Sequence, residues 1–140
     1  MDNTLPMIVL VDDDRDFLDL NKEVLEDGGY RTICFVDPQS AIAYMREEKP
    51  DLVITDLMME DLDSGFAFSR RIKEEPEFAD VFIIIVTAAS SRRGFDFRPR
   101  TSDELAAMRA DAYFSKPVPP GDLLAKVREL LNGRREKERP

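Results

Sequence analysis

The sequence predicts an α/β fold, a doubly wound five-stranded parallel sheet with helices on both faces. The first observation is that five short apolar runs alternate along the chain with five segments that carry helix-start signals or apolar residues at helical spacing. The second is that the clearest runs are continuously apolar, as in strands that helices cover on both sides of a parallel sheet. This alternation implies right-handed crossovers between successive strands.

The length and composition fit one globular domain. A chain of 140 residues is long enough for a single sizeable core, and we expect a domain over residues 1–132 and a charged, disordered tail over 133–140. Hydrophobic residues make up 43% and charged residues 35%, which argues against a membrane or disordered chain. No basic N-terminal stretch precedes a long apolar segment, so we expect a cytoplasmic protein without a secretory signal.

The charge and the missing residue types restrict the chemistry. A net charge of −9 argues against unspecific DNA binding by the domain and suits a site that concentrates a divalent cation. The chain has no histidine, which excludes Ser-His-Asp and Cys-His catalysis, histidine zinc sites and a phosphohistidine on this chain. Cys34 is the only cysteine, so an internal disulfide is impossible, and we expect a small buried apolar side chain there.

The strands are predicted from short apolar runs bounded by turn residues or carboxylates. We expect them at residues 7–11, 30–36, 51–56, 81–86 and 112–114. The fourth run is the most apolar segment of the chain, and we therefore place it in the middle of the sheet or next to the middle.

The helices are predicted from capping residues and apolar spacing. We expect them at residues 14–27, 37–49, 65–74, 101–109 and from Pro119 or Pro120 to Gly133. Gly28 and Gly29 stop the first helix, and Asp37 caps the second. The inner face of the first helix is predicted to hold Phe17, Leu18, Leu20, Val24 and Leu25, and that of the last helix Leu123, Leu124, Val127, Leu130 and Leu131.

Polar groups stand at the ends of four predicted strands. Asp12 and Asp13 follow the first, Asp56 ends the third, and Thr87 and Lys116 follow the fourth and fifth. Functional groups of a doubly wound sheet collect at the carboxyl ends of its strands. We therefore expect the three aspartates and the lysine to meet at one end of the sheet, with a cation beside the costly buried carboxylate of Asp56.

This set of side chains indicates phosphoryl transfer with a metal. Converging carboxylates repel one another, and a hard divalent cation such as magnesium relieves that repulsion. With the metal, a carboxylate oxygen of Asp56 can attack phosphorus. Lys116 can pair with that carboxylate and then with a phosphoryl oxygen, while Thr87 offers a hydroxyl donor.

The motifs VDD at 11–13, TD at 55–56, TA at 87–88 and KP at 116–117, in this order at strand ends, resemble the receiver domain of bacterial two-component response regulators. The resemblance covers residues 7–132. It implies a stand-alone CheY-like domain of the flavodoxin-like (βα)5 type, with strand order 2-1-3-4-5. It also implies a signalling domain and not an enzyme, with self-phosphorylation from a phosphodonor and slow loss of the phosphate as its only reactions.

The resemblance further implies a role for each matching residue. Asp56 would be the phosphoacceptor. Magnesium would be held by Asp13 directly, by Asp12 largely through water, by Asp56 and by the backbone carbonyl of Met58. Phosphoryl binding and the switch would use Thr87, Ala88, Tyr113 and Lys116, with Thr87 moving toward the new charge and Tyr113 turning inward.

Partners follow from the same resemblance. The phosphodonor would be a phosphohistidine on a sensor histidine kinase or a histidine phosphotransfer protein. Only eight residues remain after Asn132, so we expect output by contact with an unknown protein target and neither nucleic acid nor membrane as a partner, unless the chain is a fragment.

Two segments depart from the family pattern. After Asp56, Glu60 and Ser64 stand where the family usually has proline and glycine, which we interpret as a one-residue insertion. Residues 90–103 lengthen the spacing between the fourth and fifth strands. Phe95 and Phe97 in this insertion either anchor it on the core or form a partner surface.

Other interpretations stay open at this point. The acids after the first strand could simply cap the first helix and have no role in metal binding. Asp56 could be a solvated strand-end acid. A receiver-like interaction module that works without phosphorylation is the alternative function. An aspartate-using phosphatase or a flavin protein of similar layout is a third, although Met58 stands where that phosphatase would carry an acid.

Overall fold

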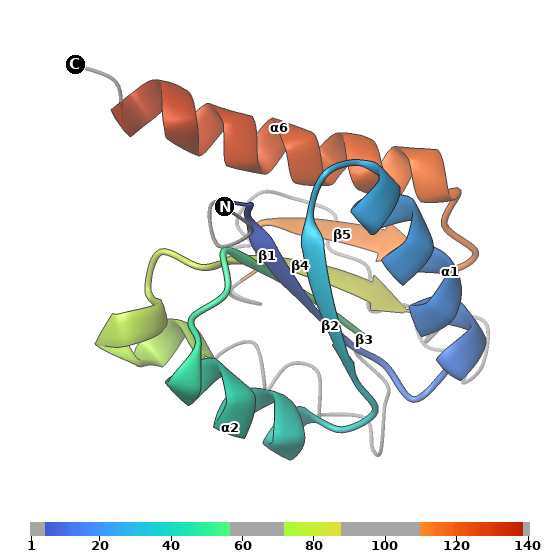
Figure 1. Cartoon of the computed structure of the whole chain (residues 1–140), viewed down its shortest axis with the longest axis horizontal. Helices are drawn as coiled ribbons and strands as arrows, with labels where there is room; N and C mark the ends of the chain where they lie inside the picture. Colours follow the sequence, from blue (N-terminus) through green and yellow to red (C-terminus); the bar gives the residue numbers. More distant parts are fainter. Residues whose placement is uncertain (1–4, 57–71, 88–109, 139–140) are drawn as a thin grey trace.

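The computed structural model describes residues 5–56, 72–87 and 110–138, with side chains up to residue 133 and excluding that of Thr87. Within these residues a single parallel sheet runs through the molecule in the order β2-β1-β3-β4-β5 (Figure 1). The strands are β1 (Met7–Val11), β2 (Arg31–Phe35), β3 (Leu52–Asp56), β4 (Phe82–Thr87) and β5 (Ala112–Ser115). The predicted fold class and strand order are confirmed, and β4 lies next to the central strand β3.

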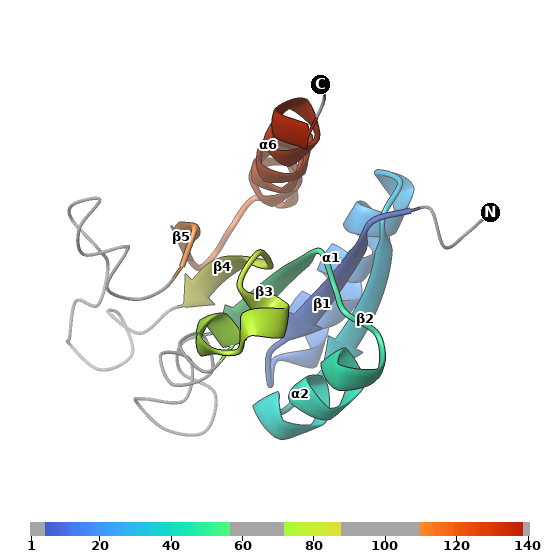
Figure 2. The ribbon, with the colours of Figure 1, turned by 90° about the vertical axis from the view of Figure 1, so that its left-hand side faces the viewer.

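Helices cover both faces of the sheet. They are α1 (Arg15–Asp27), α2 (Pro38–Glu47), the 3-10 helix η2 (Pro76–Phe78) and α6 (Pro120–Glu138), and residues 72–74 are also helical. Helices α1 and α6 pack on one face, whereas α2 and η2 lie on the other (Figure 2). The predicted helix at 101–109 and most of the one at 65–74 fall outside the described residues.

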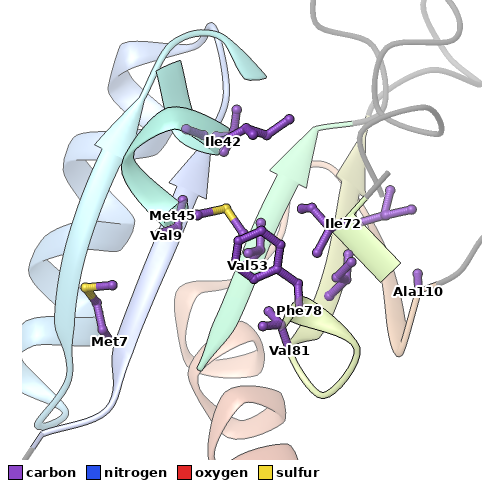
Figure 3. Packing of buried hydrophobic residues seen from close by; sticks show 13 residues of the cluster. Met7, Val9, Ile42, Met45, Val53, Ile72, Phe78, Val81 and Ala110 are labelled. Carbon is purple, nitrogen blue, oxygen red and sulfur yellow. The ribbon is translucent and has the colours of Figure 1, made fainter. Parts of the chain in front are cut away.

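Alternating strand residues feed two hydrophobic clusters, one on each face, because successive side chains of a strand point to opposite sides. The first cluster combines Val9, Val53 and Ile83 of the sheet with Met45 of α2 and Phe78 of η2 (Figure 3). The second combines the intervening strand residues with the inner faces of α1 and α6, and includes Ile8, Leu10, Ile54, Ile84, Leu18, Leu25, Leu123, Val127 and Leu131. Both sides of the sheet are therefore buried, as the continuous apolar runs predict.

Side-chain caps begin the first two helices where the sequence places them. The Asp14 carboxylate accepts hydrogen bonds from the amides of Asp16 (3.1 Å) and Phe17 (3.2 Å), which satisfies two of the free N–H groups at the start of α1. The Asp37 carboxylate accepts from the Ser40 amide at 2.8 Å at the start of α2.

Gly29 has φ of 101° after the end of α1, a conformation that favours glycine.

Three expectations about single residues need correction. Gly133 does not end the last helix, because α6 continues to Glu138, and the arginines, lysine and glutamates that follow are strong helix formers. Leu20 is 50% exposed, since the buried stripe of α1 passes through Leu18, Asn21 and Leu25. Cys34 is half-buried at the edge of the second cluster and not fully enclosed.

None of the helices in the described part of the chain is both long enough and apolar enough to cross a membrane.

Candidate functional site

Three side chains meet at the carboxyl edge of the sheet. Asp12 directly follows β1, Asp56 is the last residue of β3, and Lys116 directly follows β5. Because the strands are parallel, these three positions share one edge. Asp12 is 0% exposed and Asp56 2% exposed, so both carboxylates need a partner to offset the loss of water.

Lys116 is that partner for both aspartates. Its Nζ lies 2.8 Å from Asp12 Oδ2 and 3.1 Å from Asp56 Oδ2. Strand β4 separates β5 from β3, and neighbouring strands lie about 4.8 Å apart, so only a long side chain can reach the two acids from the end of β5. The cation predicted beside Asp56 is present, and the Lys116–Pro117 peptide bond is cis.

The second oxygen of Asp12 is fixed by the chain that follows it. Asp12 Oδ1 accepts a hydrogen bond from the Asp14 amide at 2.9 Å, and the Asp12 amide donates to the Phe35 carbonyl of β2 at 3.0 Å. The Asp14 amide thus orients the carboxylate, and the Phe35 carbonyl holds the backbone of Asp12. Asp14 itself caps α1, so the third acid of the run has a structural role in the described geometry.

The pKa values of Asp12 and Lys116 are both raised, for different reasons. Burial raises the pKa of Asp12 to about 6, with a smaller contribution from the charge of Asp56, while the hydrogen bonds from Lys116 and from the Asp14 amide oppose this rise. Burial lowers the pKa of Lys116, but the hydrogen bond and charge of Asp12 and the charge of Asp56 outweigh burial, so its pKa is raised. Lys116 therefore stays protonated at neutral pH.

Phe17 is a residue of this site that the sequence reasoning missed. Its ring lies under the ammonium of Lys116, with Nζ 4.6 Å from the ring centroid, within the range of a cation–π contact. The sequence predicts Phe17 only as part of the inner face of α1. Contact between positions 17 and 116 depends on the tertiary fold, and the only available signal was an aromatic residue in the first helical turn after the acids.

A third carboxylate completes a group that suits a metal ion. Asp12, Asp13 and Asp56 each offer one oxygen, and these oxygens all lie within 4.8 Å of one another. Octahedral magnesium ligands at about 2.1 Å stand at most about 4.2 Å apart, so a small movement closes the set. Three carboxylates and one ammonium leave a net charge of −2, and oxygen donors with this charge fit a hard divalent cation.

For the other predicted site residues the structure gives only a strand position, a packing contact or no description. Thr87 is the last residue of β4 and stands opposite Ser115 of β5 in the register. Tyr113 of β5 is half-buried and packs against the first hydrophobic cluster. Met58, Ala88, Phe95 and Phe97 lie outside the described residues.

Comparisons with known proteins identify a family and similar structures for this chain. The family model of the response regulator receiver domain matches residues 8–128. Regulatory protein VanRc of Enterococcus gallinarum is 34% identical over 124 residues, which cover 89% of this chain and 49% of the relative. Transcriptional regulatory protein YvrH of Bacillus subtilis (strain 168) is 36% identical over 127 residues, which cover 89% of this chain and 48% of the relative. The chain thus spans about half the length of these two relatives.

A solved structure gives the same result. The response regulator receiver domain protein (CheY-like) from Methanospirillum hungatei JF-1 matches with a TM-score of 0.75 and 28% sequence identity, over 95% of this chain and 98% of that chain.

Proposed function

The chain belongs to the family of response regulator receiver domains of two-component systems, and from this premise we propose that it is a phosphoacceptor switch. In this proposal Asp56 accepts a phosphoryl group from a phosphohistidine donor in the presence of magnesium. Residues 1–132 form the receiver unit.

One observation carries the proposal: a single half-buried ammonium is shared by two buried carboxylates at the strand ends, 2.8 Å from Asp12 and 3.1 Å from Asp56. A structural ion pair needs only one acid. The second and third acids add repulsion that costs stability, and such a cost is typical of functional sites with perturbed charges.

Each residue has a distinct role in the proposed reaction. Asp12, Asp13 and Asp56 would hold magnesium, together with the Met58 carbonyl that the family resemblance implies. When bound, the metal neutralises charge on the attacking and transferred oxygens. Asp56 supplies the nucleophilic oxygen, and Lys116 moves its hydrogen bond from the carboxylate to a phosphoryl oxygen.

The signal leaves the site through β4 and β5 in this proposal. Thr87 ends β4 and would donate its hydroxyl to the phosphoryl group, with the Ala88 amide beside it. Tyr113, in the neighbouring strand, would then turn inward. The output is contact with a protein target, and Phe95 and Phe97 are proposed as part of that surface.

The phosphodonor is proposed to be a sensor histidine kinase or a histidine phosphotransfer protein. The absence of histidine from this chain fits a donor on a separate molecule. The relatives VanRc and YvrH are named as regulatory proteins and are about twice as long, so the activity of a whole protein of that length is not assigned to this chain.

Incubation with magnesium and a small acyl phosphate, followed by intact-mass measurement, tests the proposal. We expect the unmodified protein to gain one phosphoryl group and Asp56→Asn to gain none. Asp16→Asn is the matched control, because it removes the same charge from an exposed site in the first turn of α1 and should leave the gain unchanged. No gain in the unmodified protein would contradict the proposal and favour a receiver-like module that works without phosphorylation.

A further inference from the structure

The ammonium of Lys116 is held by groups from three different elements. Asp12 after β1 and Asp56 at the end of β3 accept its hydrogen bonds, and Phe17 of α1 presents its ring face at 4.6 Å. Two of these three groups belong to the carboxylate cluster that suits a metal ion. The ring is the one contact of the three that does not belong to that cluster.

The carboxylate contacts and the ring contact of Lys116 respond differently to a bound divalent cation. A hard divalent cation takes oxygen ligands and draws the charge of Asp12 and Asp56 toward itself, which weakens their attraction for the ammonium. The face of an aromatic ring attracts an ammonium but offers no oxygen for a hard cation. A metal ion that shares the carboxylates therefore does not compete for the ring contact, while Lys116 must still point at the reacting oxygen.

The structure fixes the backbone of Phe17 on both sides. Its amide donates to the Asp14 carboxylate at 3.2 Å, and its carbonyl accepts a hydrogen bond from the Asn21 side chain at 2.9 Å. Asn21 is only 2% exposed although it is polar, so this hydrogen bond replaces the water that its amide lost. A buried asparagine and a capping aspartate thus hold the backbone from which the ring projects.

The contacts among Lys116, Asp12, Asp14 and Phe17 also form a closed loop. Lys116 Nζ bonds Asp12 Oδ2, Asp12 Oδ1 accepts from the Asp14 amide, Asp14 Oδ1 accepts from the Phe17 amide, and the Phe17 ring faces Lys116 Nζ. Each member restricts the next, so the ring and the carboxylate approach the ammonium from directions set by the same turn of chain.

We infer that Phe17 is a positioning residue, whose ring keeps the Lys116 ammonium directed at Asp56 while the carboxylates are occupied by a metal ion. This inference rests on the proposed phosphoacceptor function. Phe17 does not contact the reacting atoms itself, and it acts only through Lys116.

Phosphorylation rates of two variants test this role. Phe17→Leu keeps an apolar side chain in the first turn of α1 but removes the ring, and Phe17→Tyr keeps the ring. At saturating magnesium we expect Phe17→Leu to slow phosphorylation by a small acyl phosphate about fivefold, with unchanged magnesium affinity, and Phe17→Tyr to stay within about twofold of the unmodified protein. Equal rates for the leucine variant and the unmodified protein would overturn the inference, as would a magnesium affinity that falls together with the rate.

A second measurement does not depend on phosphorylation. Ring currents shift the NMR signals of protons that lie over an aromatic face, so the ε-methylene protons of Lys116 should be shifted upfield in the unmodified protein and in Phe17→Tyr. Phe17→Leu should lose this shift, and magnesium should leave it in place in the unmodified protein. Loss of the shift on adding magnesium would overturn the inference. If the unmodified protein takes up no phosphate while the shift persists in magnesium, the proposed function fails and the contact itself stands.

Discussion

At the scale of single residues, the site holds a charged group in a buried position, which costs stability. Asp12 lies at the end of a buried strand and is fully enclosed, and burial raises the pKa of its carboxyl group to about 6. A carboxylic acid whose pKa is raised by folding holds its proton more tightly in the folded chain than in the unfolded chain. The contribution of Asp12 to the free energy of unfolding therefore falls as the pH rises from about 4 to about 6, and it stays low above that range.

Asp12→Asn should make the protein more stable in the absence of magnesium. A rise of about two pKa units, which already includes the opposing interaction with Lys116, corresponds to at most about 3 kcal/mol, so we expect a gain of between about 1 and 3 kcal/mol near pH 7.5. The gain should shrink as the pH falls toward about 5, because Asp12 of the unmodified protein then takes up a proton. Urea denaturation in a chelating buffer at both pH values measures it.

The exposed Asp16→Asn serves as the control for this comparison, since it removes one charge without removing a buried carboxylate. An Asp12→Asn protein that is less stable than the unmodified chain at both pH values would show that the ion pair outweighs the cost of burial.

At the scale of the elements, helix α1 connects the site to the C-terminal helix. Its N-terminus carries the Asp14 cap and Phe17, and its C-terminus ends at Gly28 against α6. A Cβ atom at Gly28 would stand 2.9 Å from Leu124 Cδ1 of α6, so a side chain there would require the flexible end of Leu124 to move. Gly28 has φ of −79°, so contact and not backbone strain limits this position.

Gly28→Ala should lower the free energy of unfolding by at most about 0.5 kcal/mol, because the atom nearest the added methyl group is the flexible end of the Leu124 side chain, which can move aside. In a Leu124→Ala background the same change should stabilise the protein slightly, since the clashing atoms are gone and alanine lowers the conformational entropy of the unfolded chain. Gly29→Ala is the control: Gly29 has φ of 101° and no neighbour near the added Cβ, so its cost should be the same in both backgrounds. Denaturation of the single and double variants tests this coupling, and an additive result would contradict it.

At the scale of the whole molecule, the parallel sheet brings distant parts of the sequence to one edge. Asp12, Asp56 and Lys116 are separated by as many as 104 positions, yet each follows or ends a strand of the same sheet. Ion binding at this edge should therefore stabilise the entire fold and not one loop, because the ligands come from strands β1 and β3 at the centre of the sheet.

Magnesium should raise the midpoint of thermal unfolding. At ten times its Kd, an ion that binds only the folded chain adds about 1.4 kcal/mol. Asp13 is the exposed member of the carboxylate cluster, so Asp13→Asn should keep the metal-free stability within about 0.5 kcal/mol and lose most of the magnesium effect. Thermal unfolding with and without magnesium measures both. An equal effect of magnesium on both proteins would show that the ion binds elsewhere.

The sequence was sufficient for the strands, the first two helices and the meeting of Asp12, Asp56 and Lys116, because continuous apolar runs followed by polar residues constrain a parallel sheet strongly. It was insufficient where local signals compete with context. Gly133 carries a stop signal, but the helix formers on its C-terminal side extend α6 to Glu138. Leu20 fits an apolar spacing, yet Asn21 takes the buried position because its side chain bonds the Phe17 carbonyl.

Asp56 is the proposed carrier of the phosphoryl group, and the position of that group can be measured directly. Borohydride reduces an aspartyl phosphate to homoserine, which peptide mass spectrometry then locates after treatment with magnesium and an acyl phosphate. We expect homoserine at position 56 and at no other position. Homoserine at position 12 or 13, or none at all in a folded protein that binds magnesium, would contradict it.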